Sequence, residues 1–233
     1  MIEQTQFISI VSHQLRTPAS TMKWYLETLL ENRHGNPIND WQRDKLHQVY
    51  QSNERMISLI NDLLNVSRLE AGKLMIKPTA VVLATVVNPV LEELLHFAHA
   101  NNVEITAQLP SDLPAVSADG DKLREVCLNL VSNAIKYSQR GHRPVIISAR
   151  VVANMVECAV KDEGIGMSDE AQTHLFEKFF RADNAIELQT EGSGLGMYIA
   201  REIIRLHGGD IRVVSTLNQG TTVYFTLPIY ETK

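Results

Sequence analysis

Two long stretches of helical periodicity occupy the first 72 residues. They span residues 2–32 and 41–71, and "RHGNPIND" at residues 33–40 separates them. Gly72 follows as a plausible helix terminator. In both stretches apolar residues recur at helical spacing and form one stripe, namely Ile8, Val11, Leu15, Met22, Leu26 and Leu29 in the first and Leu46, Val49, Met56, Leu59, Ile60, Leu63, Leu64 and Val66 in the second. The pattern predicts a two-helix hairpin.

A single hairpin has too little bulk to cover both faces of such an apolar stripe. Two copies that pack into a four-helix bundle would cover it. We therefore expect a homodimer.

The pattern changes after Lys73 to short β-branched runs that alternate with helical segments. Helices are expected near residues 87–101, 121–138 and 198–206. The expected strands lie in "KLMIKPTAVVL", "VEITAQL", "AVSA", "PVIISARVV", "NMVECAVKD", "DIRVVST" and "TTVYFTLP". We predict an α+β chain in which a helical hairpin, residues 1–72, precedes an α/β sandwich, residues 73–233, with a mixed, largely antiparallel sheet.

Composition excludes several classes of protein. The net charge is −5, and no dense Lys/Arg block suggests a nucleic-acid groove or a basic membrane patch. No apolar run is long enough for a transmembrane segment, and no charged leader precedes one. Cys127 and Cys158 lack metal-type spacing, which fits a reducing compartment. We expect a cytoplasmic protein without a nucleic-acid partner and without a membrane segment in this chain. A membrane tether elsewhere in a longer parent protein is compatible with this expectation.

One histidine lies on the polar side of the first predicted helix, in "FISIVSHQLRTP". His13 is roughly 170° from the centre of the apolar stripe, so its imidazole should be exposed. Thr17 lies on the same face within roughly 40°, and Pro18 removes a backbone hydrogen bond next to it. An exposed histidine by itself needs no function, so its meaning depends on the other motifs.

The segment "DKLREVCLNLVSNAIKYS" predicts an amphipathic helix with an unusual polar face. Glu125, Asn129, Asn133 and Lys136 share that face, and the neighbouring apolar face should pack on the sheet through Leu123, Val126, Cys127, Leu130 and Ala134. Amides beside a lysine suit a magnesium–phosphate site, because Mg²⁺ prefers hard oxygen ligands. A merely solvated polar face is the alternative.

Two glycine-rich segments add to this set. "VKDEGIGM" places Asp162 at the end of a strand before Gly164 and Gly166, where a carboxylate can accept from an exocyclic amine and the backbone can pass close to a ring. A plain turn is the alternative reading. "EGSGLGM" places Gly192, Gly194 and Gly196 at the entrance of a helix, which attracts phosphate. The G-x-G-x-G spacing is not the dinucleotide fingerprint.

Taken together and in this order, these segments resemble the catalytic core of a bacterial two-component sensor histidine kinase. "SHQLRTP" is similar to the H box, which implies that His13 is the phosphoacceptor. "NLVSNAIKYS" resembles the N box, which implies Asn133 as an Mg²⁺ ligand with Asn129 beside it, Lys136 on the phosphates and Tyr137 against the base.

The remaining boxes are similar to the family pattern as well. "DEGIGM" resembles the G1 box, which implies that Asp162 binds the adenine amine. "LFEKFFRAD" resembles the F box through Phe176, Phe179 and Phe180, with Arg181 as a phosphate contact. "GSGLGM" resembles the G2 box, and "ADNAIELQTE", residues 182–191, is the expected lid without a clear period.

The resemblance implies both a fold and a reaction. The fold is a dimerisation hairpin joined to a gyrase/Hsp90-like ATP-binding domain. The reaction is ATP- and Mg²⁺-dependent phosphorylation of His13, followed by transfer to an aspartate of a response regulator receiver domain. Thr17 stands where the family orients a hydrolytic water, which implies a phosphatase activity toward that regulator.

Two other functions compete with this reading. The first is a catalytically weak dimeric scaffold that binds ATP or a regulator, which only Gln14 supports. The second is a gyrase-like ATPase. Proteins of that class have an E-x-x-x-N arrangement in which the glutamate orients water, whereas Asn129 stands at the glutamate position here and cannot act as a base.

Gln14 departs from the family pattern, which has Glu or Asp directly after the histidine. An amide oxygen can hold the imidazole tautomer but cannot take its proton as a carboxylate does. We predict that Gln14→Glu raises the initial rate of His13 phosphorylation, measured with γ-labelled ATP. An unchanged rate would discard this role for position 14.

Overall fold

The computed structural model describes residues 2–31, 38–138, 144–188 and 192–231, with side chains from residue 15 onward. The chain forms two compact units, Met1–Leu74 and Met75–Lys233, which are described separately. In the described residues, no helix is both long and apolar enough to cross a bilayer.

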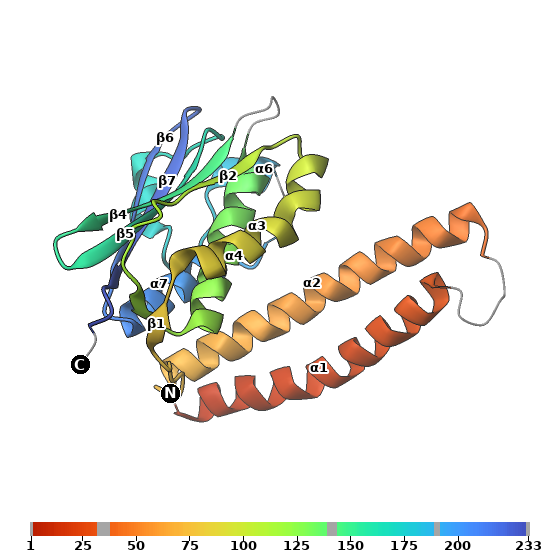
Figure 1. The fold of residues 1–233 in the computed structure, drawn as a ribbon. Helices are drawn as coiled ribbons and strands as arrows, with labels where there is room; N and C mark the ends of the chain where they lie inside the picture. Colours follow the sequence, from red (N-terminus) through yellow and green to blue (C-terminus); the bar gives the residue numbers. More distant parts are fainter. Residues whose placement is uncertain (1, 32–37, 139–143, 189–191, 232–233) are drawn as a thin grey trace. The chain divides into compact units, whose positions relative to one another are not determined.

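The first unit is the predicted hairpin of two helices, α1 (Ile2–Leu30) and α2 (Asp40–Glu70) (Figure 1). Asn39 begins α2 with a capping box, because its side chain accepts from the Gln42 N–H at 2.8 Å and the Gln42 side chain accepts from the Asn39 N–H at 2.9 Å. Gly72, with φ of 62°, ends the helix, and the Lys73 N–H donates to the Arg68 carbonyl. Local signals therefore account for both ends of α2.

The apolar residues of the hairpin divide into two seams. Ala19 and Leu26 of α1 and Ile60 and Leu64 of α2 are buried within the hairpin. A second set remains exposed, namely Leu15, Met22 and Leu29 of α1 and Val49, Met56 and Leu59 of α2. Within one chain α2 therefore covers only part of the predicted stripe, and the exposed part is the surface that the expected second copy would cover. The side chains of Ile8 and Val11 lie outside the described ones.

The second unit contains the predicted mixed sheet. Its order is β2-β4-β5-β7-β6, with only β2 and β4 parallel and the other neighbours antiparallel. The strands are β2 (Ile105–Gln108), β4 (Val145–Val152), β5 (Met155–Asp162), β6 (Ile211–Thr216) and β7 (Gly220–Pro228). A separate antiparallel pair joins β1 (Thr79–Val81) to β3 (Val116–Ala118). The expected α+β class is confirmed.

Three helices complete the core of this unit: α3 (Leu83–Ala100), α4 (Gly120–Tyr137) and α7 (Gly196–Leu206) (Figure 1). Helix α4 packs against α3, α7 and the sheet. The predicted apolar face of α4 is buried, as are the facing residues of the sheet and of α7, including Val156, Cys158, Val160, Phe225, Leu227, Ile199, Ile203 and Ile204. This packing leaves the polar face of α4 turned away from the core.

Several elements differ from the sequence prediction. Helix α3 begins at Leu83 rather than near residue 87. The β-branched residues Val82, Thr85 and Val86 around this start made the sequence resemble a strand there, whereas Leu83 and Val86 pack in the core as parts of the helix. Two short helices, α5 (Asp169–His174) and α6 (Asp183–Leu188), were not predicted. Helix α6 lies in the expected lid, residues 182–191, whose sequence has no clear period. For α5 a start signal exists, since the Ser168 hydroxyl accepts from the Ala171 N–H.

Candidate functional site

Two asparagines join α4 to the start of α7. The Asn133 amide Nδ2 donates to Oδ1 of Asn129 at 3.1 Å and contacts Sδ of Met197 at 3.6 Å. Gly196 lies directly against Asn129, because a Cβ at this glycine would lie 2.6 Å from the Asn129 amide. The glycine at the entrance of α7 is therefore required for the polar face of α4 to approach that helix.

The donor set of α4 suits a hard cation and phosphate. Both Asn133 contacts use Nδ2, so neither engages the amide oxygen, which is the ligand type that Mg²⁺ prefers. Lys136 is half-buried one turn further along, whereas Glu125 accepts from Lys122 Nζ at 2.7 Å. The described residues contain no cluster of three or more His, Cys, Asp or Glu side chains arranged for a metal. Any Mg²⁺ here would depend on the amide and on the ligand's own oxygens.

Asp162 ends β5 as a buried carboxylate with 8% exposure. Its Oδ1 accepts from the N–H of Gly164 at 2.8 Å and from the N–H of Thr221 at 3.2 Å. Burial raises the pKa of Asp162 to about 6, and the two backbone hydrogen bonds oppose that rise. Since both contacts end on Oδ1, the second oxygen can accept from a ligand.

The predicted glycines of the 162–167 turn allow close backbone packing. A Cβ at Gly164 would lie 2.1 Å from the Tyr137 carbonyl oxygen, which already accepts from the Ile165 N–H at 3.0 Å. Gly166 has φ of 60°, and a Cβ at this position would clash with the Thr216 carbonyl. Its own carbonyl accepts from Nδ2 of Asn184 in α6. The turn therefore connects Asp162 to the carboxyl end of α4, where Tyr137 lies.

The second glycine segment, residues 192–196, is hydrogen-bonded to the F-box segment. The Phe179 N–H donates to the Gly194 carbonyl at 3.0 Å, and both residues have left-handed backbones with φ of 64° and 66°. A Cβ on Gly194 would clash with the Phe179 backbone, and one on Gly192 would contact the Arg181 guanidinium at 3.4 Å. Phe180 is half-buried, with its ring 5.7 Å from that of His174. Arg181 thus lies beside Gly192.

The structure brings most predicted site residues of the second unit into one connected set. Residues that the sequence reasoning missed also belong to it, namely Thr221, Met197 and Asn184. Thr221 could not be found by pattern, because it meets Asp162 only through the pairing of β5 with β7. In the first unit Thr17 is exposed, while the side chains of His13 and Gln14 lie outside the described ones.

Comparisons with known proteins define the family. The model described as "Histidine kinase-, DNA gyrase B-, and HSP90-like ATPase" matches residues 118–231, and "His Kinase A (phospho-acceptor) domain" matches residues 3–72. The chain belongs to the two-component sensor histidine kinases and carries their catalytic core.

Individual relatives agree with this assignment. Sensor histidine kinase WalK of Bacillus subtilis is 35% identical over 98% of the chain and 37% of its own length. Signal transduction histidine-protein kinase BarA of Escherichia coli is 32% identical over 95% of the chain and 24% of its own length. Full-length ShkA in complex with AMPPNP superposes with a TM-score of 0.79 at 28% identity, over 97% of the chain and 47% of ShkA. The chain therefore spans less than half the length of these relatives.

The buried charge of Asp162 predicts a pH-dependent stability. Because its pKa is higher when folded than the ordinary 3.8, the folded state holds the proton more tightly, and stability falls as pH rises from about 4 to 6. A shift of about two pKa units corresponds to about 3 kcal/mol. Asp162→Asn retains the oxygen that accepts from Gly164 and Thr221. It should therefore raise the free energy of unfolding at pH 7.5 by about 1–3 kcal/mol, and much less at pH 4.5.

Urea unfolding followed by circular dichroism measures this difference. The two tryptophans, Trp24 and Trp41, are both in the hairpin, so their fluorescence reports on the first unit separately. Asp210→Asn, at an exposed position, is the matched control and should show no such gain. An equal gain at both pH values would contradict the assignment of the effect to Asp162.

Proposed function

We propose that this chain phosphorylates its own His13 from ATP and passes the phosphoryl group to an aspartate of a response regulator receiver domain. The proposal is carried by the polar face of α4, where Asn129 and Asn133 meet Gly196 and where the turn after Asp162 packs on Tyr137, in a chain whose family match includes a phosphoacceptor domain. We assign residues 1–72 to dimerisation and phosphotransfer and residues 73–233 to ATP binding. The cytoplasm is the compartment that we assign to the reaction, because it fits both ATP and the response regulator.

Asp162 is proposed to select the adenine base. A buried carboxylate whose Oδ1 is held by two backbone N–H groups presents its other oxygen to a donor such as an exocyclic amine. Gly164 and Gly166 let the turn after Asp162 pack closely on the Tyr137 and Thr216 carbonyls, so that Tyr137 lies beside this turn, where it would contact the base. The known nucleotide complex of the related kinase ShkA, with AMPPNP, supports an ATP site in this fold.

The phosphate end of ATP is assigned to α4 and to the glycine segment before α7. Asn133 would ligate Mg²⁺ through its amide oxygen, with Asn129 holding the Asn133 amide in place. Lys136 and Arg181 would offset phosphate charge, and the backbone of Gly192, Gly194 and Gly196 would approach the phosphates. Bound Mg²⁺ would neutralise charge on the transferring group.

The hairpin supplies the acceptor and the dimer interface. The exposed apolar residues of α1, Leu15, Met22 and Leu29, recur every seven residues, and α2 adds Val49 and Met56 at the same interval. Heptad spacing of exposed apolar side chains is typical of helices that pack in a left-handed bundle. We infer that a second copy covers this seam and completes a four-helix bundle.

The decisive experiment tests for phosphohistidine. Purified chain is incubated with γ-labelled ATP and Mg²⁺ beside a His13→Ala control, and we expect protein-bound label that is acid-labile, base-stable and absent from the control. Nucleotide binding without label would favour the scaffold, to which Gln14 points. Label released only as free phosphate would favour an ATPase.

Thr17 is proposed to orient water for dephosphorylation of the regulator. Its exposure on α1 leaves it accessible to a partner. Thr17→Ala should suppress dephosphorylation of the phosphorylated receiver domain several-fold more than it slows His13 labelling, because only hydrolysis needs the water. Equal losses in the two assays would remove this role.

A further inference from the structure

Helix α1 has a weak point at Pro18, five residues after the proposed phosphoacceptor His13. Pro18 lies inside the helix and has no N–H to donate to the Gln14 carbonyl. The Thr21 hydroxyl donates to the Thr17 carbonyl at 3.0 Å, a contact that favours bending of helices. The backbone that carries His13 and Thr17 is therefore held less firmly by α1 itself than a regular helix would hold it.

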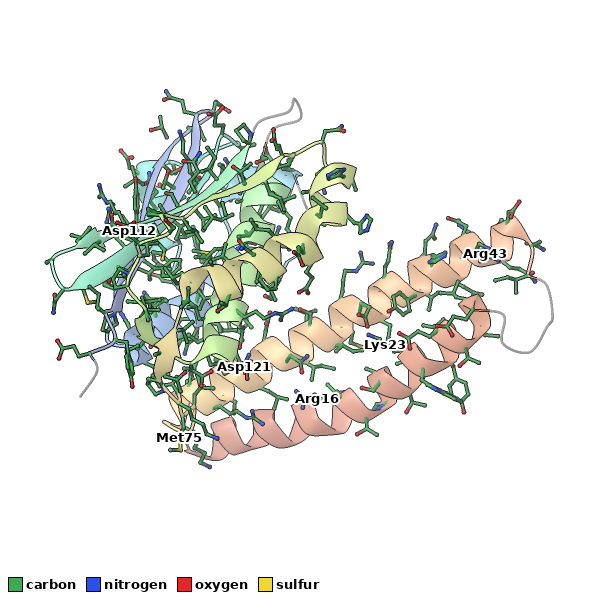
Figure 2. The ribbon with its side chains drawn as sticks, in the orientation of Figure 1. Arg16, Lys23, Arg43, Met75, Asp112 and Asp121 are labelled. Atoms are coloured by element: carbon green, nitrogen blue, oxygen red, sulfur yellow. The ribbon has the colours of Figure 1, made fainter. Side chains whose placement is uncertain are left out.

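One asparagine of α2 holds α1 on the amino-terminal side of this weak point. The Arg16 guanidinium Nη2 donates to Oδ1 of Asn61, across the hairpin. Figure 2 shows Arg16 between the two helices. Arg16 is half-buried and lies three residues after His13, so this contact fixes the turn of helix that carries the phosphoacceptor.

A second asparagine of α2 holds α1 on the carboxyl-terminal side. Asn53 Nδ2 donates to the Ala19 carbonyl at 2.9 Å, in the apolar seam with Ile60 and Leu64. Asn53 is only 5% exposed, and within the described part of the chain its Oδ1 is buried without a hydrogen-bond partner. A half-satisfied buried amide lowers stability relative to an apolar residue of the same shape. Stability alone therefore does not account for an amide at this position.

We propose that Asn61 and Asn53, the asparagine clasp, are positioning residues for the phosphoryl-transfer reactions of His13. The clasp fixes α1 to α2 on both sides of Pro18 and so sets the direction in which His13 and Thr17 point. This inference rests on the proposed kinase function. Because a misplacement of about 1 Å at a reacting group can lower a rate by about 10²-fold, loss of either contact should slow phosphorylation without affecting nucleotide binding.

Substitutions in the full chain separate positioning from folding. Asn61→Leu removes the acceptor for Arg16, whereas Asn61→Asp retains one. Asn53→Leu removes the contact to Ala19 together with the unpaired Oδ1. We expect Asn61→Leu and Asn53→Leu to lower the initial rate of His13 labelling at least fivefold, with the KM for ATP within twofold of the wild type. Asn61→Asp should restore the rate.

Two further measurements complete the test. The melting temperature of Asn53→Leu should equal or exceed that of the wild type, and Ser58→Ala, at an exposed position of α2, should leave all values unchanged. Amide hydrogen exchange of residues 9–17 should be faster in Asn61→Leu than in the wild type. A loss of rate with no loss of stability is the signature that a purely structural role would not produce.

The outcomes distinguish this inference from the function on which it rests. Wild-type chain that takes no label overturns the proposed function, and exchange then still decides whether the clasp restrains α1. Unchanged exchange in Asn61→Leu overturns the clasp, whatever the label shows. Faster exchange with an unchanged labelling rate overturns the positioning role.

Discussion

The packing of α4 against the sheet is the constraint on which the second unit depends. Leu123, Val126, Cys127, Leu130 and Ala134 bury one face of the helix, and this burial fixes the direction of the opposite face. Asn129 and Asn133 consequently lie where α7 begins, and Gly196 lets the two helices approach. The hydrophobic effect thus positions amides that by themselves contribute little to stability.

The same core also buries the carboxylate of Asp162, and this burial lowers the stability of the folded state. Its carboxylate is buried beside apolar strands, so its pKa rises, and two backbone N–H groups only partly compensate. A charge held in such surroundings interacts more strongly with a ligand donor than an exposed one would. The raised pKa and the capacity to recognise a ligand therefore have one physical cause.

The hairpin illustrates the difference between a pattern and a contact. Helix spacing placed Leu15, Met22, Leu26 and Leu29 on one stripe of α1, yet Leu26 is buried together with Ala19 while Leu15, Met22 and Leu29 remain exposed. A periodicity gives the face of one helix, but the division of that face between an intrachain and an interchain seam depends on how two helices cross. Asn53 has no sequence signal of its role, because a single amide among polar neighbours carries no periodicity.

The sequence by itself determined the class of the protein. Helical and strand periodicity, the terminator Gly72 and the ordered motifs were enough to predict the hairpin, the mixed sheet and the candidate site residues Asn133, Asp162 and Gly196, because these signals are local in the chain. Tertiary structure alone decided which distant residues complete the site. Thr221 reaches Asp162 through strand pairing, Asn184 reaches Gly166 from α6, and Asn61 reaches Arg16 across the hairpin. Such contacts arise when elements far apart in the sequence pair with one another, and no local spacing of residues in a single sequence indicates which elements will pair.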